Sequence, residues 1–172
     1  MTVWTVGHST RTQEEFTALL LSFGIEMVAD VRSFPGSRRY PQFNKENIEF
    51  WLTETGIRYM QIPQLGGRRK PQPDSLNTMW RHPAFRAYAD YMETVGFAEG
   101  IGILTGVAEK YRTAIMCSEA VWWRCHRSMI SDYLKSEGWE VIHIMGVGKS
   151  EEHPYTKAAR IEAGRLTYRG LL

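Results

Sequence analysis

The sequence predicts an α/β fold: one three-layer domain, residues 1–172, with a mostly parallel five-stranded sheet and helices on both faces. Two observations lead to this prediction. Short apolar segments, partly β-branched, alternate along the chain with segments whose apolar residues recur at helical spacing. The strand-like segments are apolar on both sides, which is typical of a parallel sheet covered by helices. The length suits a single core, so no second domain is needed.

Five segments have the composition of buried strands, and a sixth is a candidate near the end of the chain. The five are residues 3–6, 25–31, 57–62, 113–116 and 140–144, and the candidate is 166–168. Residues 146–150 are rich in glycine but lack the spacing of a phosphate-binding loop. The strand order stays open at this point.

Helices are predicted between these strands from apolar stripes, capping residues and glycine stops. Thr12 and Glu15 have the spacing of a capping box, and Gly24 is a natural end for the helix that follows. Further helices are expected at residues 46–55, 83–94, 97–110, from about 123 to 137, and in a short piece at 156–162.

Composition and charge exclude several classes of protein. The chain is 43% hydrophobic and 23% charged with a net charge of +2, which is ordinary for a globular domain and gives no general argument for nucleic acid. No apolar run approaches the ~18 residues of a membrane helix, and the first residues lead straight into a strand. We therefore expect a cytoplasmic protein without a membrane segment, and the two cysteines fit a reducing compartment.

The fold is organised around residues 113–127, where an apolar run ends at a cluster of chemically capable side chains. Cys117 and Glu119 follow the strand, and Cys125, His126 and Arg127 fall in the first turns of the expected helix. In open α/β sheets ligands bind in the crevice beyond the carboxyl ends of the strands, and a helix N-terminus favours an anion.

Other strands bring polar residues to the same edge, because all carboxyl ends of a parallel sheet face one way. His8 and Ser9 follow the first strand, and Asp30 and Arg32 follow the second. We expect these four residues to meet the 113–127 segment at this carboxyl rim.

The chain also carries several motifs in a fixed order. They are Gly7-His8-Ser9, Asp30-Val31-Arg32 with Pro35, Leu65-Gly66-Gly67-Arg68, Cys117-x-Glu119 with Cys125-His126-Arg127, and Val141-x-His143-Ile144. Over nearly the whole chain they resemble the domain-of-unknown-function family 488. The resemblance implies an α/β domain of bacterial and archaeal cytoplasm, and it supplies no catalytic roles.

Four rim residues are predicted to do chemistry. Cys117 is a candidate nucleophile, and the alternative is a buried small hydrophobe. Glu119 is either a general acid/base or a salt-bridge partner. His8 and His126 are the best titratable candidates. Two other histidines have no predicted role: His143, inside a strand, is expected to be a hydrogen-bonded core residue, and His153, before a proline, is expected to be solvated.

Arginines are predicted to bind an anion at the rim. The guanidinium groups of Arg32, Arg39 and Arg127 suit a phosphate or carboxylate, with Arg68 in a second basic loop and Ser9 nearby. Asp30 is expected to orient Arg32 or Arg127 by a bidentate pair. Aromatic residues interleaved with these arginines are a signature of nucleotide or nucleic-acid binding; they are Tyr40, Phe43, Trp122 and Trp123.

These observations predict an enzyme that binds a phosphate-bearing ligand, namely a nucleotide, a nucleoside or a nucleic-acid end, and that performs hydrolysis or group transfer without a cofactor. Cys117, Cys125 and His126 lack a recognised zinc spacing, so no metal is expected. Two alternatives stay open: a non-catalytic nucleic-acid-binding module that uses the two basic loops, and a thiol-based redox protein. Trp122 and Trp123, if exposed, would indicate a homodimer surface.

Overall fold

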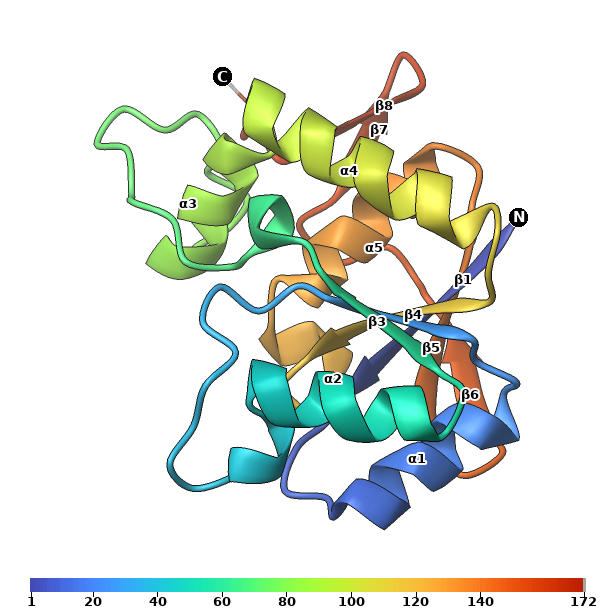
Figure 1. Cartoon of the computed structure of the whole chain (residues 1–172). Coiled ribbons are helices and arrows are strands. Elements are labelled where there is room, and N and C mark those ends of the chain that lie inside the picture. Colours follow the sequence, from blue (N-terminus) through green and yellow to red (C-terminus); the bar gives the residue numbers. More distant parts are fainter. Residues whose placement is uncertain (172) are drawn as a thin grey trace.

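The structure, a computed structural model, describes residues 1–171 and has an α/β architecture built on a six-stranded, mostly parallel sheet (Figure 1). The strand order is β3-β2-β4-β1-β5-β6, and only β6 runs antiparallel to its neighbour. The strands are β1 (Thr2–Gly7), β2 (Met27–Asp30), β3 (Arg58–Gln61), β4 (Thr113–Cys117), β5 (Glu140–Gly146) and β6 (Lys149–Glu152). The predicted fold class is confirmed.

The helices cover both faces of this sheet. In Figure 1, α1 and α2 lie below the sheet, and α3, α4 and α5 lie above it. They span α1 (Gln13–Ser22), α2 (Lys45–Glu54), α3 (Pro83–Tyr91), α4 (Val95–Ala108) and α5 (Arg127–Ser136), with short 3₁₀ turns η1 (Pro41–Phe43), η2 (Pro63–Leu65) and η3 (Trp122–Arg124).

Side-chain alternation along the strands creates two apolar cores. In β4, Ala114 and Met116 point to the core shared with α1 and α2, whereas Ile115 and Cys117 point to the core shared with α4 and α5. Successive side chains of a strand face opposite sides of a sheet, so strands buried on both faces must be apolar throughout. Cys117 therefore faces α5.

The strand order places a topological switch point in the middle of the sheet. β4 lies between β2 and β1, although it is far from both of them along the chain. The carboxyl ends of β1, β2 and β4 consequently meet, and in doubly wound sheets this crevice is where ligands bind. The convergence expected of His8, Asp30 and Cys117 follows from this topology.

Local signals of helix ends agree with the structure at α1. Thr12 caps the helix in a reciprocal capping box with Glu15, and Gly24, with φ of +63°, follows it. The expected break between α3 and α4 also occurs, because Thr94 caps a new helix that begins at Val95.

The C-terminal third differs from the sequence-based expectation. Within the glycine-rich residues 146–150, residues 147–148 form the turn from β5 into β6, which pairs with β5 and becomes the sixth strand. The candidate strand at 166–168 instead belongs to a separate hairpin of β7 (Arg160–Glu162) and β8 (Arg165–Thr167). The helix expected at 156–162 is absent, and a turn leads into β7 there. Local composition did not predict the β5–β6 and β7–β8 hairpins, because their turns depend on two glycines with positive φ, Gly148 and Gly164.

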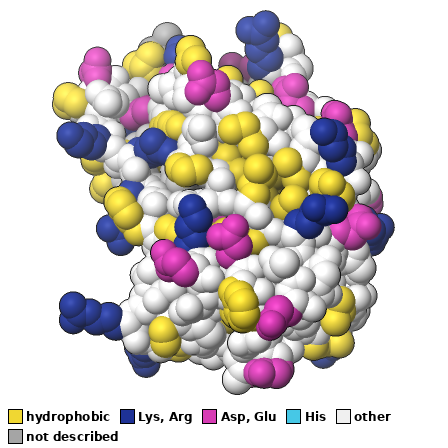
Figure 2. Space-filling model, in the orientation of Figure 1, with side chains coloured by type: hydrophobic (Ala, Val, Ile, Leu, Met, Phe, Trp, Pro, Cys, Tyr) yellow, Lys and Arg dark blue, Asp and Glu magenta, His cyan; other side chains and the backbone are white. Residues whose placement is uncertain are grey.

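The surface of the molecule carries both charged and apolar side chains (Figure 2). Figure 2 shows that charged side chains of both signs alternate around the visible face, while apolar side chains gather over α4. Within residues 1–171, no helix combines the length and the apolar character that crossing a bilayer requires. In the same residues, no cluster of three or more His, Cys, Asp or Glu side chains is arranged to hold a metal ion.

Candidate active site

A cavity of about 510 Å³ opens at the carboxyl ends of β1, β2 and β4. We call it the rim pocket. Its lining comes from five segments far apart along the chain: His8, Arg32, Ser33, Phe34, Gly36, Ser37, Tyr40, Gly67, Arg68, His82, Ala84, Phe85, Cys117, Ser118, Arg124, Cys125 and His126. Another cavity of about 500 Å³ lies between the 69–76 segment and α3, and its lining contains no cysteine or histidine. The chemically capable residues therefore gather in the rim pocket.

Two cysteines contact each other on the wall of the rim pocket. Cys117 is the last residue of β4, and Cys125 lies between η3 and α5 in an extended conformation. Their Sγ atoms are 2.8 Å apart, and both side chains are buried and free of a disulfide. At this distance either thiol can donate a hydrogen bond to the other sulfur.

Arg127 is a buried cation near the two cysteines, and its charge lowers the pKa of both thiols. Its side chain is 1% exposed, and no carboxylate of the described residues lies within salt-bridge distance. One Nη2–H donates to the carbonyl oxygen of Glu119 at 3.0 Å, and Nε has no partner. A buried cation is costly unless a negative group compensates it. The guanidinium is held against the turn that follows Cys117, so a thiolate there would supply that charge.

The two thiols accordingly differ in acidity. Burial raises the pKa of Cys117, but the hydrogen bond with Cys125 and the charge of Arg127 outweigh it and lower this pKa to about 7. Burial and the neighbouring Cys117 raise the pKa of Cys125 well above its ordinary value. With a pKa of about 7, Cys117 is partly ionised at neutral pH, and its thiolate can accept a hydrogen bond from the Cys125 thiol, while Cys125 Sγ accepts the backbone N–H of Arg127 at 3.3 Å.

A glycine allows the loop after Cys117 to fold over β1. A Cβ atom added at Gly7 would lie 1.7 Å from the carbonyl oxygen of Glu119. The backbone N–H of His8 donates to Cys117 O, and that of Ser9 donates to Ser118 O, both at 3.0 Å. These contacts fix the 117–119 turn, so Gly7 serves the site by allowing close approach of two backbones.

His8 lies in the pocket as a neutral imidazole. Its Nδ1–H donates to the carbonyl oxygen of Ser9 at 2.8 Å, so Nε2 carries a lone pair that accepts from Arg32 Nη1 at 3.3 Å. The ring stacks on Phe43 with centroids 4.3 Å apart. Burial lowers its pKa to about 4, aided by the charge of Arg32. At neutral pH, His8 is therefore a hydrogen-bond acceptor without a proton to give at Nε2.

Asp30 holds Arg32 in the bidentate pair that the sequence led us to expect. Arg32 Nε and Nη2 donate to the two carboxylate oxygens at 2.9 and 2.7 Å. The hydroxyl of Tyr59 donates to Asp30 at 2.5 Å, and Arg32 also donates to the carbonyl oxygen of Phe43. Arg32 is oriented and largely occupied by these partners, and it faces the pocket next to His8.

His126 is fixed by the second strand and by two glycines. Its Nε2–H donates to the carbonyl oxygen of Val31 at 2.8 Å, and burial lowers its pKa to about 4. A Cβ atom added at Gly67 would lie 2.5 Å from His126 Nδ1, and one at Gly66 would lie 2.5 Å from the Ser33 hydroxyl. The Gly-Gly pair therefore lets the basic loop close directly over His126.

The remaining predicted residues occupy different positions. Arg68 is exposed at the pocket with its guanidinium 5.1 Å from the Phe34 ring. Arg39 and Ser9 do not line the pocket, and Arg39 is exposed beside Tyr40. The Glu119 side chain is exposed outside the lining, and its carbonyl oxygen makes the site contacts. The rim exposure expected of Arg127 is corrected, because this side chain lies fully buried behind Cys117.

Several residues that line the pocket were not among those predicted to form the site. Arg124 is exposed at the pocket, and Ser118, Phe34 and His82 also line it. Arg124 falls in the η3 turn, whereas it was expected in the first turn of the following helix. Trp122 is 9% exposed and Trp123 is 50% exposed, so only the latter remains for the predicted homodimer surface.

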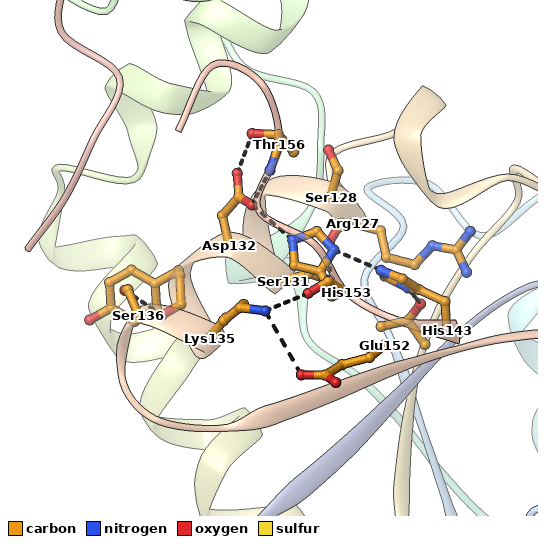
Figure 3. Close-up of polar contacts among 12 residues, drawn as sticks. Arg127, Ser128, Ser131, Asp132, Lys135, Ser136, His143, Glu152, His153 and Thr156 are labelled. Carbon is orange, nitrogen blue, oxygen red and sulfur yellow. Dashed lines mark hydrogen bonds and ion pairs between the residues drawn. The ribbon is translucent and has the colours of Figure 1, made fainter. Parts of the chain in front are cut away.

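A buried polar network behind the pocket was predicted only in part: His143 is the hydrogen-bonded core residue that was expected, whereas its partners were not foreseen. His153 Nε2 lies 2.8 Å from Asp132, His153 Nδ1 lies 2.8 Å from His143 Nε2, and His143 Nδ1 lies 2.5 Å from the Thr5 hydroxyl. Figure 3 shows Arg127 beside His143 at one end of this network. His153 is therefore fully buried rather than solvated, and the network attaches the C-terminal segment to α5.

Comparisons with known proteins give one match. The sequence model of the family described as Domain of unknown function DUF488 matches residues 12–134, most of the chain. No curated protein and no solved structure matches. The matched range includes both cysteines, Arg32 and the Gly66-Gly67 pair, whereas His8 and the network residues His143 and His153 lie outside it.

Proposed function

We propose that this chain, which belongs to the family Domain of unknown function DUF488, is an enzyme that binds an anionic, phosphate-bearing small molecule in the rim pocket and acts on it with Cys117. The observation that supports this proposal is a pocket-lining thiol close to Arg127, a buried cation that has no carboxylate partner among residues 1–171. A thiolate is the nucleophilic form of cysteine, and a neighbouring cation is the usual means of stabilising it.

Binding of the anion is assigned to cations at the pocket that have free donors. Arg68 and Arg124 are exposed there, whereas Arg32 is held by Asp30 and Arg127 is buried. A guanidinium donates two parallel hydrogen bonds to a phosphate or carboxylate. The ligand's anionic group is therefore expected between Arg68 and Arg124, above the thiolate.

Aromatic side chains of the pocket favour a ligand that also carries a planar ring. Phe34 is 69% exposed, and Tyr40 and Phe85 line the same cavity. Exposed rings beside arginines bind nucleobases by stacking and by cation–π contact. This combination favours a nucleotide, a nucleoside or a nucleic-acid end.

The chemistry proposed is group transfer in two displacements. Cys117 Sγ forms a bond with an electrophilic atom of the substrate while the leaving group departs with the electrons of the broken bond. Water or an acceptor then takes the group from Cys117, which gives hydrolysis or transfer. His8 and His126 are neutral imidazoles at neutral pH, each with one nitrogen that carries no proton, so we assign them as hydrogen-bond acceptors or bases. Both free thiols suit a reducing compartment, and we propose the cytoplasm.

The test measures whether ligands protect Cys117. Nucleoside monophosphates and inorganic phosphate are added while iodoacetamide alkylates the protein, and the modified peptide is quantified. We expect saturable protection of Cys117, weakened at least tenfold by Arg124→Ala and unchanged by Arg165→Ala, an exposed control on β8. Incubation with each ligand should also leave a mass adduct on Cys117 or a chemically changed ligand.

Two outcomes would overturn the proposal. One is an alkylation rate of Cys117 that no anionic ligand alters at millimolar concentration. The other is binding of DNA or RNA that falls steeply with salt and depends on Arg39 and Arg68 but not on Cys117, which would favour the nucleic-acid-binding module.

A further inference from the structure

The second cysteine forms no covalent bond in the group transfer proposed above, yet its sulfur is in contact with the nucleophile. Cys117 and Cys125 Sγ atoms lie 2.8 Å apart, and both residues line the rim pocket. A small molecule that reaches one sulfur therefore reaches a site where the other is already in place.

We propose that Cys117 and Cys125 form a catalytic dithiol–disulfide couple that reduces small hydroperoxides. This activity goes beyond the group transfer proposed above and uses Cys125 as the resolving thiol. It needs no cation in the ligand site, only access of a hydroperoxide to the Cys117 sulfur.

The reaction balances with a hydroperoxide as oxidant and an external thiol as reductant. The Cys117 thiolate attacks the terminal oxygen of the hydroperoxide; the O–O bond breaks, and the alkoxide leaves and takes up a proton to become an alcohol. Cys117 is then a sulfenic acid. Cys125 attacks its sulfur, an S–S bond forms, the S–O bond breaks, and the hydroxyl leaves as water with the thiol proton. Two external thiols reduce the disulfide and become oxidised.

The geometry requires little movement for the second step. A disulfide joins sulfurs about 2.05 Å apart, so the two atoms must approach by about 0.8 Å. Cys125 precedes the first helical residue of α5 and has extended backbone angles, φ of −139° and ψ of 167°. Cys125 lies outside α5, although its carbonyl oxygen accepts from the backbone N–H of Ser128 at 3.1 Å, so a small shift of the segment between η3 and α5 can supply this movement.

The surroundings favour a disulfide that is readily reduced rather than a structural one. In the dithiol form, the Cys117 thiolate compensates the buried charge of Arg127, and oxidation removes that compensation. Stabilisation of the reduced form makes a disulfide more oxidising. The couple is therefore suited to turnover.

The test uses hydrogen peroxide on the whole protein and on two variants, Cys125→Ser and Cys117→Ser. For the wild type we expect intact mass spectrometry to show the loss of two hydrogens, a peptide linked through Cys117 and Cys125, and full recovery with dithiothreitol. Cys125→Ser should instead accumulate a sulfenic acid on Cys117 that dimedone traps. Cys117→Ser should show neither product, and its Cys125 should react at least tenfold more slowly.

Two results would contradict the inference: a wild type whose Cys117 is oxidised to sulfenic or sulfinic acid without the disulfide, and a wild type that does not react faster than free cysteine at pH 7. The outcome is independent of the group-transfer proposal. Ligand protection of Cys117 without disulfide formation would refute only the peroxide chemistry, and disulfide turnover without ligand binding would refute only the group transfer.

Discussion

Replacing Cys125 by alanine tests how the protein stabilises the Cys117 thiolate. The Cys125 thiol donates to Cys117 across 2.8 Å inside the protein, and the substitution removes this donor while leaving Arg127 in place. A hydrogen bond to a charged group contributes about 1.5–3 kcal/mol, and 1.36 kcal/mol corresponds to one pKa unit. The pKa of Cys117 should therefore rise from about 7 by about one to two units.

The assay follows the rate of alkylation of Cys117 by iodoacetamide from pH 5 to 10, read from its peptide by mass spectrometry. The midpoint of the pH profile gives the pKa of the Cys117 thiol. Cys125→Ser is the matched control, because a hydroxyl keeps a donor at this position and should give a smaller increase. A Cys125→Ala midpoint equal to or below that of the wild type would refute the claim that Cys125 stabilises the thiolate.

Three further predictions concern stability, measured by urea unfolding. Gly7→Ala places a methyl group against the Glu119 carbonyl oxygen and should lower the free energy of unfolding by about 3 kcal/mol or more. The control is Gly102→Ala in α4, where the added methyl group meets no atom within 4 Å. This substitution should raise the free energy of unfolding by up to about 1 kcal/mol. Unfolded His126 takes up its proton near pH 6.5 but folded His126 only near pH 4, so stability is lost as pH falls through this window, and His126→Gln should reduce the loss by about 3 kcal/mol. Asp132→Asn breaks the buried pair with His153 and should cost about 3–5 kcal/mol; a cost below 1 kcal/mol would show that the network contributes little.

The sheet and the shared edge of its strand ends could be predicted from the sequence. Both follow from the alternation of strand-like and helix-like segments along the chain and from the parallel pairing of the strands. His8, Arg32 and Cys117 come together for that reason, and the Asp30–Arg32 pair is a local feature of two residues on one strand end. Parallel pairing places these residues on one edge of the sheet, whereas their adjacency depends on the strand order, which was not predicted.

The environment of Arg127 could not be predicted, because it depends on how residues between β4 and α5 fold. The helix was expected to begin near Trp123, which would place Arg127 at its exposed first turns. Instead η3 turns the chain, α5 starts at Arg127, and the side chain points into the protein. The same turn brings Cys125 onto Cys117, a contact between residues eight positions apart that no helical or strand periodicity encodes.

The burial of His153 depends on tertiary structure in a similar way. The residue follows β6, which itself exists only because the glycine turn at 146–148 reverses the chain onto β5. A histidine before a proline has the local character of a loop, and only the position of Asp132 on α5 makes a buried imidazole favourable there.

The central claim is that Cys117 is a reactive thiolate in a cationic pocket. It is tested most directly by comparing two alkylating reagents of similar size but different charge. Iodoacetate is anionic and iodoacetamide is neutral, and the ratio of their rates with Cys117 at pH 7 is measured against the same ratio for free cysteine. Arg68 and Arg124 at the pocket and Arg127 behind the sulfur should raise the ratio for Cys117 at least tenfold. A ratio equal to or below that of free cysteine would contradict the account.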